Sequence, residues 1–379
     1  MQDDERHSLK IAARSIICAA LTVIAPGCTK HEPSSPPSPS NPSSEDVRAA
    51  PRLDRHEGGS PARLVSSSRL SMGSTLTLTA STADDVAVGA AFEAVFAEFA
   101  RLEKLMSTWS ADSDVSRINR FAGVRPVRVS SEVREVLTIA RQLSEQTGGK
   151  FDVTFGVLSG LWKFDHDQDN VLPDMREVHR RRPLIDYRAV QIDHTAGTVF
   201  LARKGMSLHL GGIGKGYAID RAAAILRRSG LRDFMVQSGG DIYVAGMKDG
   251  RPWRLGIQDP RGAANRSFAE IDLSDGTFST SGDYERYFMK NGRRYHHILD
   301  PETGEPARGA RSATIVSNLA VHADGLSTAV FILGPGPGMA LIERLPDVEG
   351  VIVSDKNEVL ISSGLRNTVR IVAPPTDAP

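Results

Sequence analysis

The sequence predicts an α+β fold rather than the regular strand–helix alternation of a parallel sheet. Segments with strand-like alternation occur in runs, and amphipathic helical patterns interrupt these runs at irregular intervals. No repeat of about 20–50 residues is evident, which argues against solenoids and propellers. Hydrophobic residues make up 40% of the 379 positions, which is enough for a sizeable core.

Charge and cysteine content exclude several classes of function. The formal net charge is zero, so no global field attracts nucleic acid or an acidic membrane. The short basic run Arg180-Arg181-Arg182 is typical of a solvated loop or helix end. The only two cysteines are Cys18 and Cys28, so the rest of the chain can form no disulfide, thiolate zinc site or cysteine nucleophile.

The N-terminus has the pattern of an export signal. Lys10 and Arg14 precede an apolar run over 15–25, which is too short to span a bilayer and matches a signal-peptide core in length. Ala25-Pro26-Gly27-Cys28 resembles a bacterial lipoprotein cleavage site in which Cys28 is lipidated. An ordinary signal peptide cut at a nearby small residue is the alternative.

The segment after Cys28 contains a stretch, 33–44, of only proline, serine and one asparagine. Such a composition cannot bury a core and should be extended and disordered. We therefore divide the chain into a signal peptide (1–28), a Pro/Ser-rich tether (29–63) and one folded domain (64–375).

The first half of the folded part is predicted to begin with a strand and two long helices. Threonines that alternate with Leu76 and Leu78 predict a strand over 69–80. Apolar residues spaced by three and four predict an amphipathic helix over 84–106, and a second helix over 131–147 stops at two glycines. The next elements in order are a helix from Pro173, short strands within 187–210, a glycine-rich turn at 211–216 and a helix at 217–229.

The second half is predicted to be richer in strands. Alternation and tight turns predict strands over 234–245, 253–258, 269–273, 277–297 and 310–316. Residues 323–333 suit a buried helix, although their last four apolar residues would equally suit a strand. A helix over 338–345 and further strands within 348–371 complete the order.

A histidine pair lies on a predicted hairpin. Asn291-Gly292 suits a two-residue type I′ turn, and the strand that follows carries His296 and His297. Strand alternation puts the two rings on opposite faces. A histidine at a strand end beside an acid, here the turn 300–304, can transfer protons, whereas a surface or structural role is the alternative.

Two further segments could carry chemistry. Glycines before the helix in 210–217, with Lys215 among them, would let backbone N–H groups approach an anion, although the spacing matches neither a Walker A loop nor a dinucleotide fingerprint. On a helix, Asp324, Ser327 and Thr328 share one face and offer oxygen ligands that suit Mg²⁺. A plain strand-to-helix turn and a helix cap are the respective alternatives.

Taken in order, the motifs resemble the FAD:protein FMN transferase family, also called ApbE-like or thiamine biosynthesis lipoproteins. Each motif is weak alone, but their joint order and spacing over about 65–370 are specific. They are Met72-Gly73-Ser74, Met106-Ser107-Thr108-Trp109, Phe151-Asp152-Val153-Thr154, the run 210–217, Ser238-Gly239-Gly240-Asp241, Thr280-Ser281-Gly282, the run 297–304, and Asp324 with Thr328.

The resemblance implies an ApbE-like fold of mixed, largely antiparallel sheets flanked by helices. It implies an enzyme that cleaves FAD with Mg²⁺, attaches FMN through a phosphoester to a Thr or Ser of a target protein, and releases AMP. It implies His297 as the base, and Mg²⁺ on the Gly212 carbonyl, Asp324, Ser327 and Thr328. It places FAD against Met72, Trp109, Lys150, Phe151, Asp152, His209, Lys215 and Leu299.

Two residues depart from the family pattern. His209 stands where an aspartate usually precedes Leu-Gly-Gly, and Ser74 stands where a threonine usually follows Met-Gly. Two alternative functions stay open: a FAD pyrophosphatase that gives FMN and AMP, and a non-catalytic periplasmic FAD-binding lipoprotein. The expected partner is a flavin-acceptor protein of a membrane or periplasmic redox system, and the expected location is the periplasmic side of the inner membrane.

Overall fold

The computed structural model describes residues 63–165 and 167–378. The predicted signal peptide, and the predicted tether up to residue 62, lie outside the described residues. Within the described part, no helix combines the length and apolarity needed to cross a membrane.

One eight-stranded sheet organises the domain, and it confirms the predicted α+β class. Its strand order is β1-β2-β6-β7-β10-β13-β14-β15, and each neighbouring pair is antiparallel. The strands are β1 (Arg63–Ser71), β2 (Ser74–Thr82), β6 (Phe234–Ser238), β7 (Asp241–Ala245), β10 (Gly276–Gly282), β13 (Ala310–Ser317), β14 (Val348–Ser354) and β15 (Val359–Ile361).

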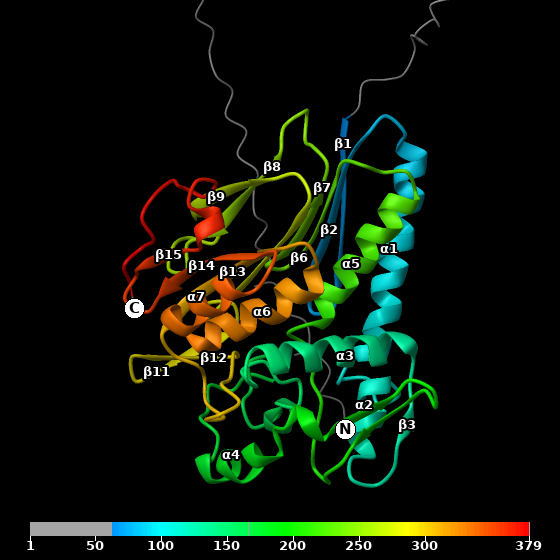
Figure 1. The fold of residues 1–379 in the computed structure, drawn as a ribbon, viewed down its shortest axis with the longest axis vertical. Helices are drawn as coiled ribbons and strands as arrows, with labels where there is room; N and C mark the ends of the chain where they lie inside the picture. The colour runs from blue at the N-terminus through cyan, green and yellow to red at the C-terminus, as the bar shows by residue number, and fades with distance from the viewer. Residues whose placement is uncertain (1–62, 166, 379) are drawn as a thin grey trace, which may run out of the picture.

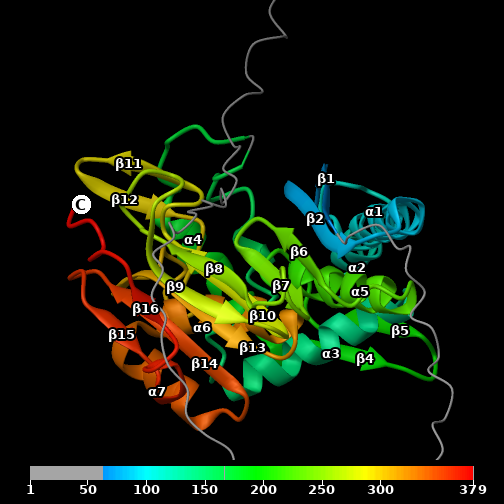
Figure 2. The same ribbon diagram turned by 90° about the horizontal axis from the view of Figure 1, so that it is seen from above.

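Helices cover one face of this sheet and a small sheet covers the other (Figures 1 and 2). Because both faces are covered, β7 is buried at every position: Tyr243 and Ala245 join the helix side, while Ile242 and Val244 join the small sheet. The helices are α1 (Asp85–Met106), α5 (Gly214–Arg228), α6 (Ala320–Leu333) and α7 (Pro335–Arg344). The small sheet has the order β16-β9-β8, from Arg370–Ile371, Ser267–Leu273 and Trp253–Gln258.

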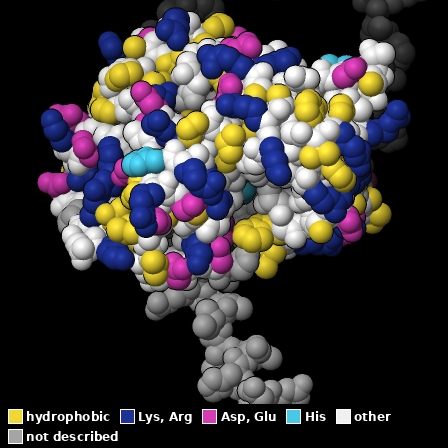
Figure 3. Space-filling view, turned by 90° about the horizontal axis from the view of Figure 1, so that it is seen from below, with side chains coloured by type: hydrophobic (Ala, Val, Ile, Leu, Met, Phe, Trp, Pro, Cys, Tyr) yellow, Lys and Arg dark blue, Asp and Glu magenta, His cyan; other side chains and the backbone are white. Residues whose placement is uncertain are grey.

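The remaining elements pack at one end of the layers, at the bottom of Figure 1. Seen from below in Figure 3, this end carries basic, acidic and hydrophobic side chains interspersed rather than gathered by type. The helices there are α2 (Asp114–Arg120), α3 (Ser131–Gln146) and α4 (Met175–Arg181). The strands there are β3 (Val127–Arg128), β4 (Val190–Asp193) and β5 (Thr198–Leu201), with the hairpin of β11 (Tyr287–Lys290) and β12 (Arg293–His296).

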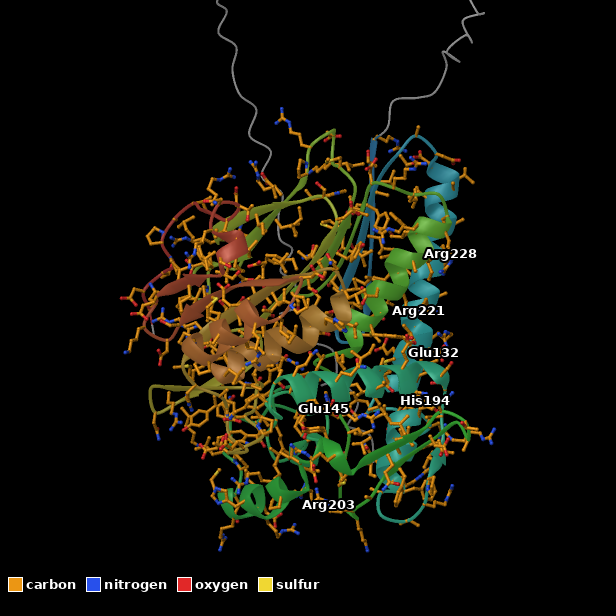
Figure 4. All side chains as sticks on the ribbon, viewed as in Figure 1. Glu132, Glu145, His194, Arg203, Arg221 and Arg228 are labelled. Atoms are coloured by element: carbon orange, nitrogen blue, oxygen red, sulfur yellow. The ribbon has the colours of Figure 1, made fainter. Side chains whose placement is uncertain are left out.

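An ion-pair network joins three of the helices. Arg101 on α1 contacts Glu98 at 2.8 Å and Glu132 of α3 at 2.7 Å. Arg221 of α5 reaches the same Glu98 at 3.2 Å. Figure 4 labels Glu132 and Arg221 at the junction of α3, α5 and α1, so this network fixes α3 against α1 and α5.

Several boundaries differ from those predicted. The predicted strand over 69–80 is a hairpin, because the chain turns at Met72-Gly73, where φ is +50° and +74°. Continuous alternation hid this turn, since two-residue turns of this type favour Asn-Gly rather than Met-Gly. The helix α2 was not predicted, and α5 begins at Gly214, inside the segment predicted as a turn.

Other predictions are confirmed. The helix predicted over 84–106 is α1, with Asp84 as its N-cap accepting from the N–H groups of Val86 and Ala87. Residues 323–333 are helical rather than extended, within α6. The Asn291-Gly292 turn has the positive φ values expected, +51° and +71°, and joins Lys290 to Arg293 across the hairpin.

Candidate active site

The N-terminal turns of α5 and α6 meet the ends of β7 and β10 at one place. Lys215, in the first turn of α5, forms an ion pair with Asp241 at the start of β7, with Nζ to Oδ2 at 2.8 Å. The other oxygen of Asp241 accepts a hydrogen bond from Ser279 of β10. Asp241 is 3% exposed, so its charge is held in place by a lysine and a hydroxyl rather than by water.

The two helices cap one another reciprocally. Asp324 of α6 accepts a hydrogen bond from the N–H of Gly216 in α5, at 2.9 Å. Asp220 of α5 accepts from the N–H groups of Ala320 and Val321 in α6, at 2.8 and 2.9 Å. Neither helix has a side-chain cap from its own N-cap residue, so each depends on the other for these backbone donors.

Burial, followed by the nearby charge of Asp241, raises the pKa of Asp324 to about 8. The ammonium of Lys215 and the N–H of Gly216 act in the opposite direction but do not cancel the rise. A buried carboxyl group of this kind favours a cation, because a bound cation compensates the cost of ionising it. The position is therefore electrostatically suited to a metal ion.

Hydroxyl groups complete this set of oxygens. Ser281 of β10 lies 2.8 Å from Ser327 and 3.3 Å from Thr328, oxygen to oxygen. A Cβ placed on Gly212 would lie 3.4 Å from the Thr328 hydroxyl, so the glycine-rich turn borders the same oxygens. The predicted metal ligands Gly212, Asp324, Ser327 and Thr328 are thus brought together.

These donors fit Mg²⁺ better than a transition metal. Among the four predicted ligands, Asp324 supplies a carboxylate, Ser327 and Thr328 supply hydroxyl groups, and Gly212 would supply its backbone carbonyl. Mg²⁺ is commonly held by one or two carboxylates while waters and substrate phosphates fill the other positions. Within the part of the chain that the structure describes, no cluster of three His, Cys, Asp or Glu side chains could hold a metal ion.

His297 lies just beyond the end of β12, and its N–H donates to the carbonyl of Arg286 at 3.1 Å. Its ring atom Nδ1 is buried and has no hydrogen-bond partner. Burial, and then the charges of Arg286, His296 and Lys215, hold the pKa of His297 well below its usual 6.5. The ring is therefore neutral at pH 7, the state that a base requires.

His296 has a structural environment instead. Its Nε2 pairs with the carbonyl of Ala307 at 3.0 Å, and Nδ1 accepts from the N–H of Ile298 at 3.3 Å. Its ring meets the edge of Phe331 with 5.3 Å between centroids, and burial lowers its pKa to about 4. The sequence predicted opposite faces of one strand for the two rings, but β12 ends at His296, so His297 lies outside the strand; the two rings nevertheless have different contacts.

The turn of the β1–β2 hairpin lies close to the ion pair of Lys215 and Asp241. Ser74, just after the turn, is 2.9 Å from Ser238, hydroxyl to hydroxyl. A Cβ on Gly239 would sit 3.6 Å from Ser74 Cβ and 3.7 Å from Lys215 Nζ. Met72 occupies a backbone region that non-glycine residues seldom adopt, and such positions concentrate at functional sites.

The polar side chains of Lys150 and Asp152 bond to other groups of the protein. Lys150 Nζ binds Asp300 at 3.0 Å and Glu302 at 2.7 Å, in the turn that follows His297. Both carboxylate oxygens of Asp152 accept hydrogen bonds. Oδ1 accepts from the N–H and the hydroxyl of Thr154, and Oδ2 accepts from the N–H of Tyr187.

Phe151 and His209, two further residues predicted to contact FAD, are packed against neighbouring protein groups. Phe151 is 4% exposed, and positions for a Cβ on Gly212 and on Gly325 lie 3.5 Å from its ring. His209 accepts from the N–H of Gly211 at 3.1 Å, and its ring lies 5.3 Å from that of Phe155. Burial, and then the charge of Arg286, lowers the pKa of His209.

Trp109 and Leu299 are at the two extremes of exposure. Trp109, in the loop after α1, is 66% exposed. Leu299 is 8% exposed and pairs with Pro306 through an isolated bridge at the turn after His297. The FAD contacts of these residues stay predictions.

Three residues at the site were not assigned from the sequence. Asp241 and Ser281 lay in two of the motifs that carry the family resemblance but had been given no role, and Arg286 lay in no motif. Arg286 pairs with Asp165 at 2.6 Å and influences the pKa values of His297, His209 and Lys215. The usable signal was the joint occurrence of Asp241 after Gly-Gly and Ser281 before Gly, each at a strand end.

Comparisons with known proteins assign this arrangement to a class. The sequence model of the ApbE family matches residues 72–352. A FAD:protein FMN transferase of Treponema pallidum is 33% identical over 300 residues, spanning 75% of this chain and 83% of that relative. One from Vibrio cholerae is 36% identical over 242 residues, spanning 63% of this chain and 72% of that relative.

Solved structures agree. The ApbE protein of Thermotoga maritima superposes with a TM-score of 0.75 at 33% identity, covering 81% of this chain and all of that one (100%). The flavin transferase ApbE of Vibrio cholerae superposes with a TM-score of 0.73 at 29% identity, with the same coverage of 81% and 100%. The class is thus that of the flavin transferases with this fold. The chain belongs to the ApbE family.

Proposed function

We propose that this protein cleaves FAD in a Mg²⁺-dependent reaction and transfers FMN to a Thr or Ser of a target protein, with release of AMP. The observation that carries the proposal is the meeting of Lys215, Asp324 and the unpartnered ring nitrogen of His297 at one place. These residues come from α5, α6 and the end of β12, and the names of relatives over most of the chain supply the substrate.

The chain's own groups can perform the transfer. His297 would take the proton from the acceptor hydroxyl, whose oxygen forms a bond to the FMN phosphorus as the bond from that phosphorus to the AMP oxygen breaks. Lys215, held by Asp241, would lie against the pyrophosphate as a fixed positive charge. Mg²⁺ held by Gly212, Asp324, Ser327 and Thr328 would neutralise negative charge on the phosphates.

The test uses the protein with FAD, Mg²⁺ and a flavin-acceptor domain. Transfer gives a fluorescent acceptor band in a denaturing gel together with AMP. AMP and FMN without a fluorescent band would instead identify a FAD pyrophosphatase that uses water at the same site. Retention of intact FAD with neither product would identify a FAD-binding carrier and overturn the proposal.

We also propose that Cys28 is lipidated and anchors the domain to the periplasmic side of the inner membrane, near a flavin-acceptor protein of a redox system. The support is the signal-like run before Cys28 and the Pro/Ser-rich segment after it. Cys28→Ser should abolish labelling by a fatty acid and release the protein from the membrane fraction. Cys18→Ser, inside the apolar run, is the matched control and should keep the label; label retained in Cys28→Ser would refute the anchor.

A further inference from the structure

Arg286 lies opposite the proposed base His297 at the open end of the β11–β12 hairpin. Within the hairpin, Phe288 lies opposite Tyr295, and their rings stack with 5.4 Å between centroids. Two residues further from the turn on each side, the N–H of His297 donates to the carbonyl of Arg286 at 3.1 Å. This hydrogen bond continues the same register just beyond the end of β12. Residues directly opposite one another in an antiparallel ladder project from the same face, so both side chains leave the hairpin on one side.

Stacked rings hold this end of the hairpin against the segment that precedes Asp165. Phe164 stacks on Phe288 at 5.8 Å and on Trp162 at 5.9 Å, centroid to centroid. The indole N–H of Trp162 donates to the carbonyl of Gly304 at 2.9 Å, in the turn that follows the hairpin. All three rings are buried. Packing therefore fixes the backbone at the open end of the hairpin and brings Asp165 beside it.

The guanidinium group of Arg286 has a partner that water and other anions can reach. Its Nη1 pairs with Asp165 at 2.6 Å, and the two side chains are 45% and 38% exposed. An exposed ion pair of this kind contributes at most about 1 kcal/mol to stability, because water competes for both charges. A guanidinium group also has five N–H donors, so a stronger acceptor can replace the aspartate at little cost.

The charge of Arg286 acts on two other residues of the candidate site. Burial, followed by this charge, lowers the pKa of His297. The same two causes, in the same order, lower the pKa of His209, which precedes the glycine-rich turn. Arg286 therefore lies near both the proposed base and a predicted FAD contact, although these residues come from different parts of the chain.

The residues already assigned to the FAD site leave part of the substrate charge unbalanced. FAD carries a negative charge on each phosphate of its pyrophosphate. The positive charge of Lys215 is matched by Asp241 at 2.8 Å, and part of the charge of Mg²⁺ would be matched by Asp324. Unbalanced charge is costly where water is excluded, so one further cation near the pyrophosphate would favour binding.

We propose that Arg286 is a further substrate-binding residue, whose guanidinium group binds the FMN phosphate of FAD. This inference rests on the proposed function. His297 would take the proton from the hydroxyl that attacks this phosphate, and Arg286 lies directly opposite His297. The guanidinium group is therefore beside the FMN phosphate rather than the AMP phosphate. It matches phosphate oxygens with paired, charge-assisted hydrogen bonds, and Asp165 returns to water when the phosphate replaces it.

FAD binding to the whole protein with Mg²⁺, measured by quenching of flavin fluorescence, tests the proposal. Arg286→Gln should raise the Kd for FAD by about 10- to 100-fold, the usual effect of losing a hydrogen bond to a charged group. Arg286→Lys keeps the charge but not the paired geometry, so the increase in Kd should be smaller. Arg254→Gln is the matched control, because Arg254 forms a similar exposed ion pair with Asp272 on the small sheet, at 2.8 Å. Its Kd for FAD should equal that of the wild type.

Asp165→Asn separates substrate binding from a structural role of the ion pair. Both Asp165→Asn and Arg286→Gln break the same pair, so both should change Tm by the same small amount. Asp165→Asn should nevertheless bind FAD at least as tightly as the wild type, because Asp165 competes with the phosphate for the guanidinium group. Equal weakening of FAD binding in the two variants would mean that the pair only maintains the shape of the site, and would overturn the proposal. An unchanged Kd in Arg286→Gln would also overturn it.

Competition with FAD identifies the phosphate that Arg286 binds. Arg286→Gln should weaken competition by FMN more than competition by AMP, and the reverse order would overturn the assignment to the FMN phosphate. The result also separates this inference from the proposed function. Wild type that transfers FMN, with FAD binding unchanged in Arg286→Gln, would overturn the role of Arg286 alone. Wild type that binds no FAD would overturn the proposed function and this inference together.

Discussion

His297 and His296 are neighbours in the chain with different chemical surroundings. The Nδ1 atom of His297 is buried without a protein partner, whereas both ring nitrogens of His296 have backbone partners. A buried ring nitrogen without a partner costs free energy unless a ligand uses it. The contrast supports a substrate contact for His297 and a packing role for His296.

His297→Ala should reduce flavin transfer by about 100- to 10,000-fold, the usual contribution of a general base. FAD binding, measured by flavin fluorescence, should change little because Lys215 and the metal ligands remain. His179→Ala, an exposed histidine on α4, serves as the control and should transfer at the normal rate. Full transfer activity in His297→Ala would remove it from the mechanism.

His296 should make the fold less stable as pH falls. Its pKa is about 4 in the folded protein and near 6.5 in the unfolded chain, so between these values the unfolded state binds more protons. Lowering the pH from 6.5 to 5 should therefore cost about 2 kcal/mol of unfolding free energy through this residue, at about 1.36 kcal/mol per pKa unit. Urea unfolding of wild type and His296→Gln at both pH values measures the free energy of unfolding. An equal change between the two pH values in both proteins would contradict this role of His296.

At the scale of elements, the reciprocal caps require α5 and α6 to approach closely. A Cβ on Gly216 would fall 2.3 Å from the carbonyl oxygen of Ala320 and 2.8 Å from Asp324 Cβ. The glycine is thus required by contact with the neighbouring helix rather than by its own dihedral angles. Glycine in this turn allows the hydrogen bond from Gly216 to Asp324 to form.

Gly216→Ala should destabilise the domain by about 1–3 kcal/mol, the usual cost of overpacking. Gly89 is the matched control, because it lies in α1 with no atom within 4 Å of its Cβ position. Gly89→Ala should instead be neutral or stabilise by about 0.5–1 kcal/mol, through better helix propensity. Denaturant unfolding of both variants gives the comparison, and equal effects would argue against the close helix contact.

Sequence patterns predicted long elements better than short ones. The helix α1 and the Asn291-Gly292 turn follow from apolar spacing and turn chemistry, which act locally. The turn at Met72-Gly73 was missed because its residues do not suit its dihedral angles, and only contacts elsewhere can hold them there. The start of α5 was placed too late because its cap, Asp324, lies 108 residues away.

The candidate site was only partly predictable for the same reason. A helix places Asp324 and Thr328 on one face, which periodicity alone reveals. The partner of Lys215 cannot be deduced in this way, since Asp241 reaches it through the pairing of β7 in the large sheet. The role of Asp152 likewise depends on Tyr187, a contact across 35 residues.

At the scale of the whole molecule, ligands should stabilise the domain by joining its layers. FAD and Mg²⁺ together would contact α5, α6 and the end of β12. Because these elements belong to one domain, binding should raise the free energy of unfolding of the domain. At a ligand concentration about 100 times Kd, the expected gain is about 2.7 kcal/mol. Thermal unfolding should show a higher Tm with FAD and Mg²⁺, and EDTA should remove the part that depends on Mg²⁺; an increase unaffected by EDTA would count against the metal site.

The mutual caps of α5 and α6 also bear on when the chain can fold. Asp220 and its donor at Ala320 are 100 residues apart, and Gly216 and Asp324 are 108 apart. During synthesis, which proceeds from the N-terminus, α5 therefore lacks its cap until α6 has been made. Contacts this distant in sequence slow folding. An early fragment that ends before α6 should remain open. Under the proposed export of this chain, that delay would keep it unfolded during passage through an export channel.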